Sequence, residues 1–183
     1  MKCNAWFVIG LTFSGAGALG CGEASTPSAA GNSSTVHGKV TADSAAYLLP
    51  EKPAGARGVI ELRMEAKDGG DIVVQGRIGG SREPFVKGRA AFTIVDAKLK
   101  PCNEIEGDTC PAPWDYCCSC GKEELAQAML MVKFVDDSGK TLAEDSQSLL
   151  HLKPLDTVVV CGKAKRDPEG NLIVLADKIH VGP

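Results

Sequence analysis

Hydrophobic and polar residues alternate in short runs along the C-terminal two thirds of the chain, and Gly, Asp and Pro separate these runs. Alternation with a period of two places apolar side chains on one face of a β-strand. In the first run, for example, Ile60, Leu62 and Met64 share one face and charged residues occupy the other. The pattern predicts six strands, over residues 58–67, 72–78, 89–96, 126–135, 157–163 and 172–181.

The segments between the runs predict how the strands connect. Residues 68–71 (Asp-Gly-Gly-Asp) predict a hairpin between the first two strands, and residues 167–171 predict another between the last two. Gly76 indicates a bulge or bend inside the second strand. Residues 122–125 form the one expected helical turn, so the fold class is all-β. A small closed or partly closed barrel of five to six strands is favoured, because an open sheet would leave exposed edges.

Residues 152–181 support a more specific expectation. They read Leu152-Lys-Pro-Leu-Asp-Thr-Val-Val-Val-Cys-Gly, then a turn and a last apolar strand. This run resembles the final strands of the OB-fold family, in which Leu-x-x-Gly-Asp-x-Val-x-Val-x-Gly precedes a hairpin and a closing strand. Asp156 matches that pattern, whereas Pro154-Leu155 stands where Gly is commoner. The resemblance implies an OB-like barrel.

The N-terminus has the order of a secretory signal. Lys2 is followed by an apolar stretch over residues 5–13, by small residues to Gly20, and then by Cys21. The tetrapeptide that ends at Cys21, Ala-Leu-Gly-Cys, resembles the lipobox of bacterial lipoproteins, although its first position is usually Leu. The resemblance implies that Cys21 is diacylated and becomes the new N-terminus. An uncleaved membrane helix and an ordinary signal peptidase site near Cys21 are the alternatives; the apolar stretch is short for a membrane span.

The predicted organisation therefore has three parts. Residues 1–20 form a lipoprotein signal peptide, residues 21–35 a lipidated and disordered tether without large apolar residues, and residues 36–183 the barrel domain. The protein is expected to be exported and lipid-anchored to the cell envelope, in the outer membrane or facing the periplasm. Its first partner is then membrane lipid, through acylated Cys21.

Composition narrows the function classes. The 183 residues carry a formal net charge of −3, which becomes −4 without Lys2, and aromatic residues make up 5%. Nucleic acids are bound by basic surfaces with stacking rings, so nucleic acid is an unlikely partner. Single-stranded nucleic-acid binding stays an alternative because the OB-fold resemblance suggests it. The basic residues available for it are Arg77, Arg82, Lys87 and Arg89.

A cysteine-rich loop spans residues 101–121, between the third and fourth strands. It contains Cys102, Cys110, Cys117, Cys118 and Cys120, while Cys161 lies on the fifth strand. Its Gly-Asp-Thr-Cys-Pro-Ala-Pro-Trp-Asp-Tyr-Cys-Cys string resembles one in uncharacterised exported bacterial proteins, and this resemblance implies no activity. In an oxidising compartment, clustered cysteines form disulfides that staple a loop lacking its own core. The six cysteines are disulfide candidates with about 15 alternative pairings.

Two other interpretations of this loop remain open. Cys102, Cys110, Cys117 and Cys118 could bind Zn²⁺ or Cu(I), which favour sulfur ligands, although the loop has neither two Cys-x-x-Cys pairs nor a histidine. Alternatively, the closely spaced pairs Cys117–Cys118 or Cys118–Cys120 could exchange disulfides.

Trp114 and Tyr116 are the candidate ligand contacts, as an aromatic platform in this loop, and the alternative is that both rings pack against the barrel. No phosphate loop, metalloprotease motif or nucleophile elbow occurs in the sequence. We therefore expect a non-catalytic binding or structural module without a cofactor. Its partner would be an unknown envelope protein or a small-molecule ligand.

Overall fold

The computed structural model describes residues 44–182. The predicted signal peptide (1–20), the acylation site Cys21 and the tether (21–35) lie outside the described residues, as do residues 36–43. Within residues 44–182, no helix combines the length and the hydropathy that a membrane span requires.

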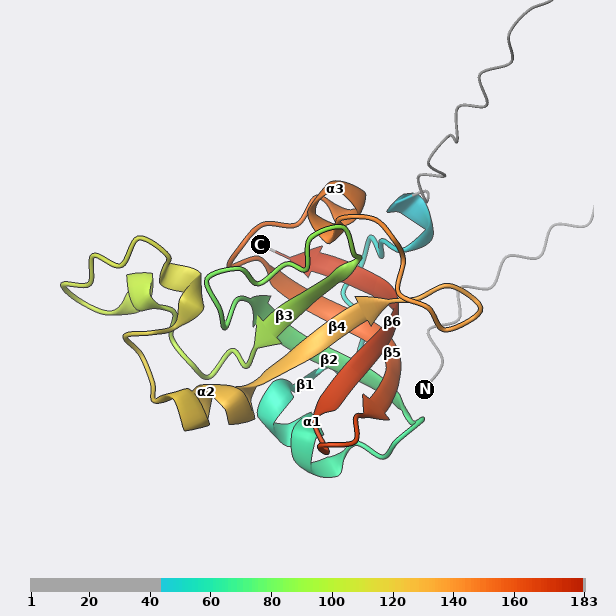
Figure 1. Ribbon diagram of the computed structural model, residues 1–183, viewed down its shortest axis with the longest axis horizontal. Helices are drawn as coiled ribbons and strands as arrows, with labels where there is room; N and C mark the ends of the chain where they lie inside the picture. Colours follow the sequence, from blue (N-terminus) through green and yellow to red (C-terminus); the bar gives the residue numbers. More distant parts are fainter. Residues whose placement is uncertain (1–43, 183) are drawn as a thin grey trace, which may run out of the picture. The chain divides into compact units, whose positions relative to one another are not determined.

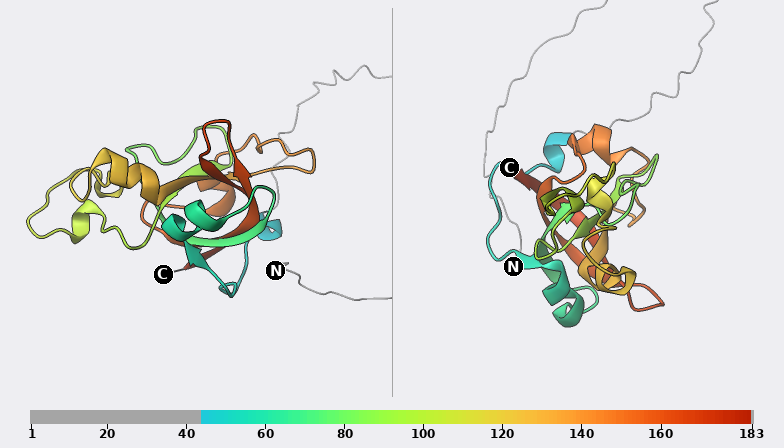
Figure 2. Two further views of the ribbon diagram at one scale, coloured as in Figure 1. Left: turned by 90° about the horizontal axis from the view of Figure 1, so that it is seen from below. Right: turned by 90° about the vertical axis from the view of Figure 1, so that its left-hand side faces the viewer.

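Five strands form a closed barrel (Figure 1, Figure 2). The sheet has six strands, β1 (Arg57–Gly58), β2 (Asp71–Ile78), β3 (Ala91–Val95), β4 (Met129–Phe134), β5 (Thr157–Arg166) and β6 (Leu172–Gly182), and the five from β2 to β6 form the barrel. Their order is β2-β3-β4-β6-β5, and β5 pairs again with β2 to close the ring. The β4–β6 pair is parallel and the other barrel pairs are antiparallel, whereas the two-residue β1 adds to β2 in parallel. A five-stranded Greek-key barrel is the OB-fold architecture, so the predicted all-β, OB-like class is confirmed.

Short helices cover both ends of the barrel (Figure 1, Figure 2). The helices α1 (Val59–Glu65) and α3 (Ser146–Leu150) lie at opposite ends, and α2 (Lys122–Ala128) lies beside α1 and leads into β4. The core consists of the inward side chains of the strands together with residues of α1 and α3; its largest fully buried members are Phe92, Phe134, Leu62, Ile78, Ile94, Leu150, Leu172 and Ile179. The barrel is thus filled by side chains and sealed by helices.

The prediction of a strand over residues 58–67 is wrong. This segment is the helix α1, whose buried residues Val59 and Leu62, followed by buried Ala66, have helical spacing, while the side chain of Met64 is 75% exposed. The first predicted hairpin is therefore absent. Two distant residues stabilise the helix ends: the carboxylate of Asp96 accepts the N–H of Ile60 at 2.9 Å, and the guanidinium of Arg166 donates to backbone carbonyls of the last turn.

The remaining strand predictions are confirmed with shifted ends. The β5–β6 hairpin forms around residues 167–171, and alternate residues of β4 face the core as expected. Residues 126–128, predicted as strand, belong to α2, which extends the predicted helical turn. The irregularity predicted at Gly76 lies instead between Cys161 and Gly162, since β2 pairs with β5 in unbroken register. Gly76 allows the backbones of β2 and β3 to approach closely, because a Cβ at this position would lie 2.8 Å from the carbonyl oxygen of Val95.

Candidate metal centre

The cysteine-rich loop belongs to the long connection from β3 to β4 and projects from the side of the barrel (Figure 1). Two short 3-10 helices, Cys102–Glu104 and Pro113–Asp115, fold it into a compact turn. Cys102 and Tyr116 are fully buried within the loop, whereas Cys117 and Cys118 are exposed. Among the cysteines of the loop, Cys117 and Cys118 are therefore the most accessible to solvent.

Four cysteine sulfurs meet at one point. The Sγ atom of Cys117 lies 3.4 Å from that of Cys118, 3.6 Å from that of Cys110 and 3.9 Å from that of Cys102. All four Sγ atoms lie within 4.8 Å of one another. Zinc bound tetrahedrally at about 2.3 Å per thiolate separates its sulfur ligands by about 3.8 Å. The arrangement therefore matches a mononuclear four-thiolate site.

None of the six cysteines described by the structure is in a disulfide, so the predicted staples are not present. Cys117 has three sulfur neighbours at similar distances, which a disulfide could not use together but a metal ion could. Cys161 is buried in β5, and Cys120 lies beside the carbonyl oxygen of Tyr116, so neither belongs to the four-sulfur group. The fold thus brings together the set Cys102, Cys110, Cys117 and Cys118.

Backbone hydrogen bonds set the geometry of this group. The N–H of Cys118 donates to the Sγ of Cys102 at 3.3 Å, an interaction that also stabilises a metal-bound thiolate. The carboxylates of Asp108 and Asp115 accept the N–H groups of Cys110 and Cys117, each at 2.9 Å. Both aspartates thus form side-chain-to-backbone turns, as their positions beside the cysteines suggest.

The electrostatics of the group favour the protonated thiol at Cys102 and Cys117 in the absence of a cation. Burial raises the pKa of the Cys102 thiol to about 11. Hydrogen bonding to the Asp115 carboxylate, and then to the sulfurs of Cys118 and Cys110, raises the pKa of Cys117. Burial by itself would raise the pKa of Asp115, but the N–H and thiol of Cys117 lower it more strongly, so this carboxyl stays ionised. A bound cation would remove the repulsion among four thiolates.

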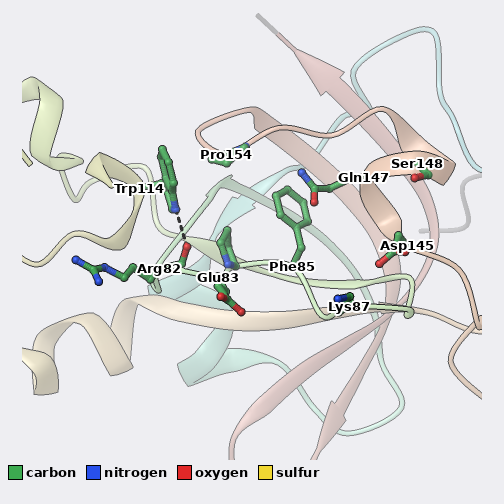
Figure 3. A pocket seen from close by; sticks show the side chains of 10 residues that line it. Arg82, Glu83, Phe85, Lys87, Trp114, Asp145, Gln147, Ser148 and Pro154 are labelled. Carbon is green, nitrogen blue, oxygen red and sulfur yellow. Dashed lines mark hydrogen bonds between the residues drawn. The ribbon is translucent and has the colours of Figure 1, made fainter. Parts of the chain in front are cut away.

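The two aromatic residues of the loop differ in burial and in what they contact. Tyr116 is completely buried in a left-handed conformation, so its ring packs rather than contacting a ligand, and burial raises its pKa to about 12. Trp114 is half-buried and donates its Nε1–H to the carbonyl oxygen of Arg82 at 3.0 Å. It forms one wall of a pocket of 540 Å³ (Figure 3).

Several walls of this pocket could not be found from the sequence. Phe85 and Pro154 face Trp114 across it, and Gln147 and Ser148 come from α3 (Figure 3). They are separated from Trp114 by long stretches of chain and carry no local pattern, so only the folded barrel identifies them.

The basic residues considered for nucleic-acid binding do not share one surface. Arg82 and Lys87 line the Trp114 pocket, where Glu83 and Asp145 balance their charge. Arg77 instead forms an ion pair with Glu104 of the cysteine loop, at 2.5 Å between Nη1 and Oε1. The pocket is therefore close to neutral.

No family model and no curated protein matches this sequence. Among solved structures, the chain is similar to the crystal structure of a putative aspartyl-tRNA synthetase from Leishmania major Friedlin, with 10% identity and a TM-score of 0.39. The match covers 75% of this chain and 24% of the synthetase, so this chain spans about a quarter of that protein's length. A similarity at this level says nothing about the activity or the substrate of this chain.

Proposed function

We propose that the protein binds one divalent transition-metal ion, with Zn²⁺ as the natural ligand, through the thiolates of Cys102, Cys110, Cys117 and Cys118. The observation that carries the proposal is the convergence of all four sulfurs within 4.8 Å. It corresponds to a closed four-thiolate site of the structural kind, which leaves no open coordination position for catalysis.

The chemistry of the loop favours Zn²⁺ over Cu(I). Residues 101–121 carry four carboxylates, Glu104, Glu106, Asp108 and Asp115, and no basic residue. Four thiolates add further negative charge, which a divalent cation compensates better than a monovalent one. The close spacing of the sulfurs also leaves no room for the sulfide ions of an iron–sulfur cluster.

The metal would supply folding free energy that the loop lacks. In residues 101–121 only four residues are buried, Pro101, Cys102, Ala112 and Tyr116. A segment with so little apolar burial is stabilised by cross-links, and a metal with four ligands is a cross-link of this kind. Coordination would also keep the thiolates from pairing as disulfides in an oxidising compartment.

The metal test uses the full chain, purified under reducing conditions and then freed of reductant. We expect one Zn²⁺ per chain by elemental analysis, and a thiolate-to-cobalt charge-transfer band when Co²⁺ replaces it. Cys110→Ser should lose stoichiometric metal, whereas the matched control Cys120→Ser, in the same loop but outside the group, should retain it. A reduced chain that stays metal-free after Zn²⁺ is added would contradict the proposal.

We further propose that this module is tethered to the cell envelope through a diacylated Cys21. The supporting observations are the N-terminal pattern of charge, apolar stretch and small residues, and the tether-like composition that follows. Intact mass of the protein from its native membrane should show a chain that begins at acylated Cys21. Cys21→Ala should abolish lipidation, and a mass equal to that of the complete unmodified chain would refute the anchor.

A further inference from the structure

Trp114 lies between two of the sulfur ligands in sequence. Cys110 and Cys117 bracket it, and their Sγ atoms are 3.6 Å apart. A metal that binds both thiolates would close the segment 110–117 into a ring and remove most of its conformational freedom. The position of Trp114 would then be fixed from inside the loop.

The same residue is attached to the barrel from outside the loop. Its indole N–H donates to the carbonyl oxygen of Arg82, and its own carbonyl oxygen accepts the N–H of Gly80 at 2.8 Å. Gly79 lets the two backbones meet, because a Cβ there would lie 2.5 Å from the carbonyl oxygen of Trp114. Trp114 is therefore the point at which the cysteine loop is fastened to the β2–β3 connection.

Trp114 also completes the 540 Å³ pocket described above (Figure 3). The opposite side is built by Phe85, which packs against the core, and by residues of the connection around α3. These elements belong to the barrel and do not depend on the cysteine loop. The wall made by Trp114 is the part of the pocket that the loop supplies.

We propose that metal binding at the four-cysteine site holds Trp114 against the β2–β3 connection and thereby completes this pocket. The inference rests on the proposed function and adds regulation to it. In the metal-loaded chain the pocket is complete, whereas in the metal-free chain its Trp114 wall is missing. Thermodynamic linkage requires the reverse effect as well, so fastening Trp114 strengthens metal binding by the same factor.

The experiment follows Trp114 directly. In the full chain with Trp6→Phe, Trp114 is the sole tryptophan, so its emission and its quenching by acrylamide report its exposure. Addition of one equivalent of Zn²⁺ to the metal-free chain should shift the emission to the blue and reduce the quenching constant. With Cys110→Ser the response should vanish, and with Cys120→Ser it should persist.

The reciprocal measurement uses zinc affinity, determined by competition with a chelator. Trp114→Ala should weaken zinc binding by about tenfold, within the usual range for coupled sites. Gln147→Ala, an exposed residue that lines the same pocket from α3, should leave the affinity unchanged. Circular dichroism of each variant verifies that the barrel remains folded.

The outcomes separate the two proposals. If zinc binds stoichiometrically but neither the quenching nor the effect of Trp114→Ala appears, the coupling is refuted and the metal site stands. If no zinc binds, the proposed function fails and the coupling fails with it. A response to zinc that persists in Cys110→Ser would also overturn the coupling, because the signal would then arise elsewhere.

Discussion

The contact between Gly79 and the cysteine loop gives a sharp test of how tightly the loop is seated on the barrel. Gly79 follows β2, and its backbone is fixed on the other side: its N–H donates to the carbonyl oxygen of Thr93, whose hydroxyl donates to the carbonyl oxygen of Gly79 at 2.6 Å. A Cβ at this position would lie 2.5 Å from the carbonyl oxygen of Trp114 and 2.9 Å from the ring of Tyr116. Gly79→Ala must therefore push the loop outward.

The magnitude follows from these contacts. Forcing a methyl group into a packed interface costs about 1–3 kcal/mol. The displaced carbonyl of Trp114 would also weaken its hydrogen bond with the N–H of Gly80, worth about 1 kcal/mol. We therefore expect Gly79→Ala to lower the free energy of unfolding by about 2–4 kcal/mol.

The measurement is equilibrium urea unfolding of the zinc-loaded full chain, with fluorescence and circular dichroism required to give coincident transitions. Gly182→Ala is the matched control, since a Cβ there would meet only ordinary contacts at 3.7 and 3.8 Å. It should change the free energy of unfolding by less than about 0.5 kcal/mol. If Gly79→Ala is no more destabilising than this control, the loop does not sit against β2 as described.

Three further predictions concern the barrel and can be checked by the same unfolding assay. Leu62→Lys should unfold the protein, because this side chain is fully buried, whereas Met64→Lys should change stability by less than about 0.5 kcal/mol; equal effects would favour the strand over the helix. Asp96→Ala should cost about 0.5–2 kcal/mol through loss of the bond to the N–H of Ile60, and a neutral result would remove its capping role. Arg166→Met should cost about 1–3 kcal/mol, because the carbonyls of Arg63 and Ala66 lose their donor, and Lys165→Met, also on β5, serves as its control.

The sequence predicted the barrel well because its strands depend on local alternation. The buried faces of β4 and β6 and the β5–β6 hairpin follow directly from a period of two and a turn rich in Asp and Gly. Residues 58–67 were wrongly predicted as a strand because their charged residues also alternate with apolar ones. Asp96 and Arg166, which lie far away in the chain, stabilise the ends of the helix there, and no local pattern reveals such partners.

The candidate site was predicted in part. The four converging cysteines were identified as a set, but the preference for disulfides came from the expected compartment rather than from geometry. Sequence spacing alone does not show that Cys102 meets Cys117 across the turn, because the 3-10 helices and the Asp108 and Asp115 turns bring them together. Tyr116, a candidate ligand contact by composition, is instead fully buried with its ring close to Gly79, a contact that no local pattern reveals.

The order of strands in the barrel has a consequence for folding kinetics. The longest antiparallel pairing of β2 is with β5, and it joins residues far apart in sequence, such as Val74 and Val160. The strands β3 and β4 also pair, although the whole cysteine loop lies between them in sequence. Topologies with such non-local pairings fold slowly, because the loops must close before the contacts form. A metal that binds the unfolded loop and joins Cys102 to Cys118 would shorten the distance between β3 and β4 along the cross-linked chain. Zinc should then increase the rate of folding, in addition to stabilising the folded protein.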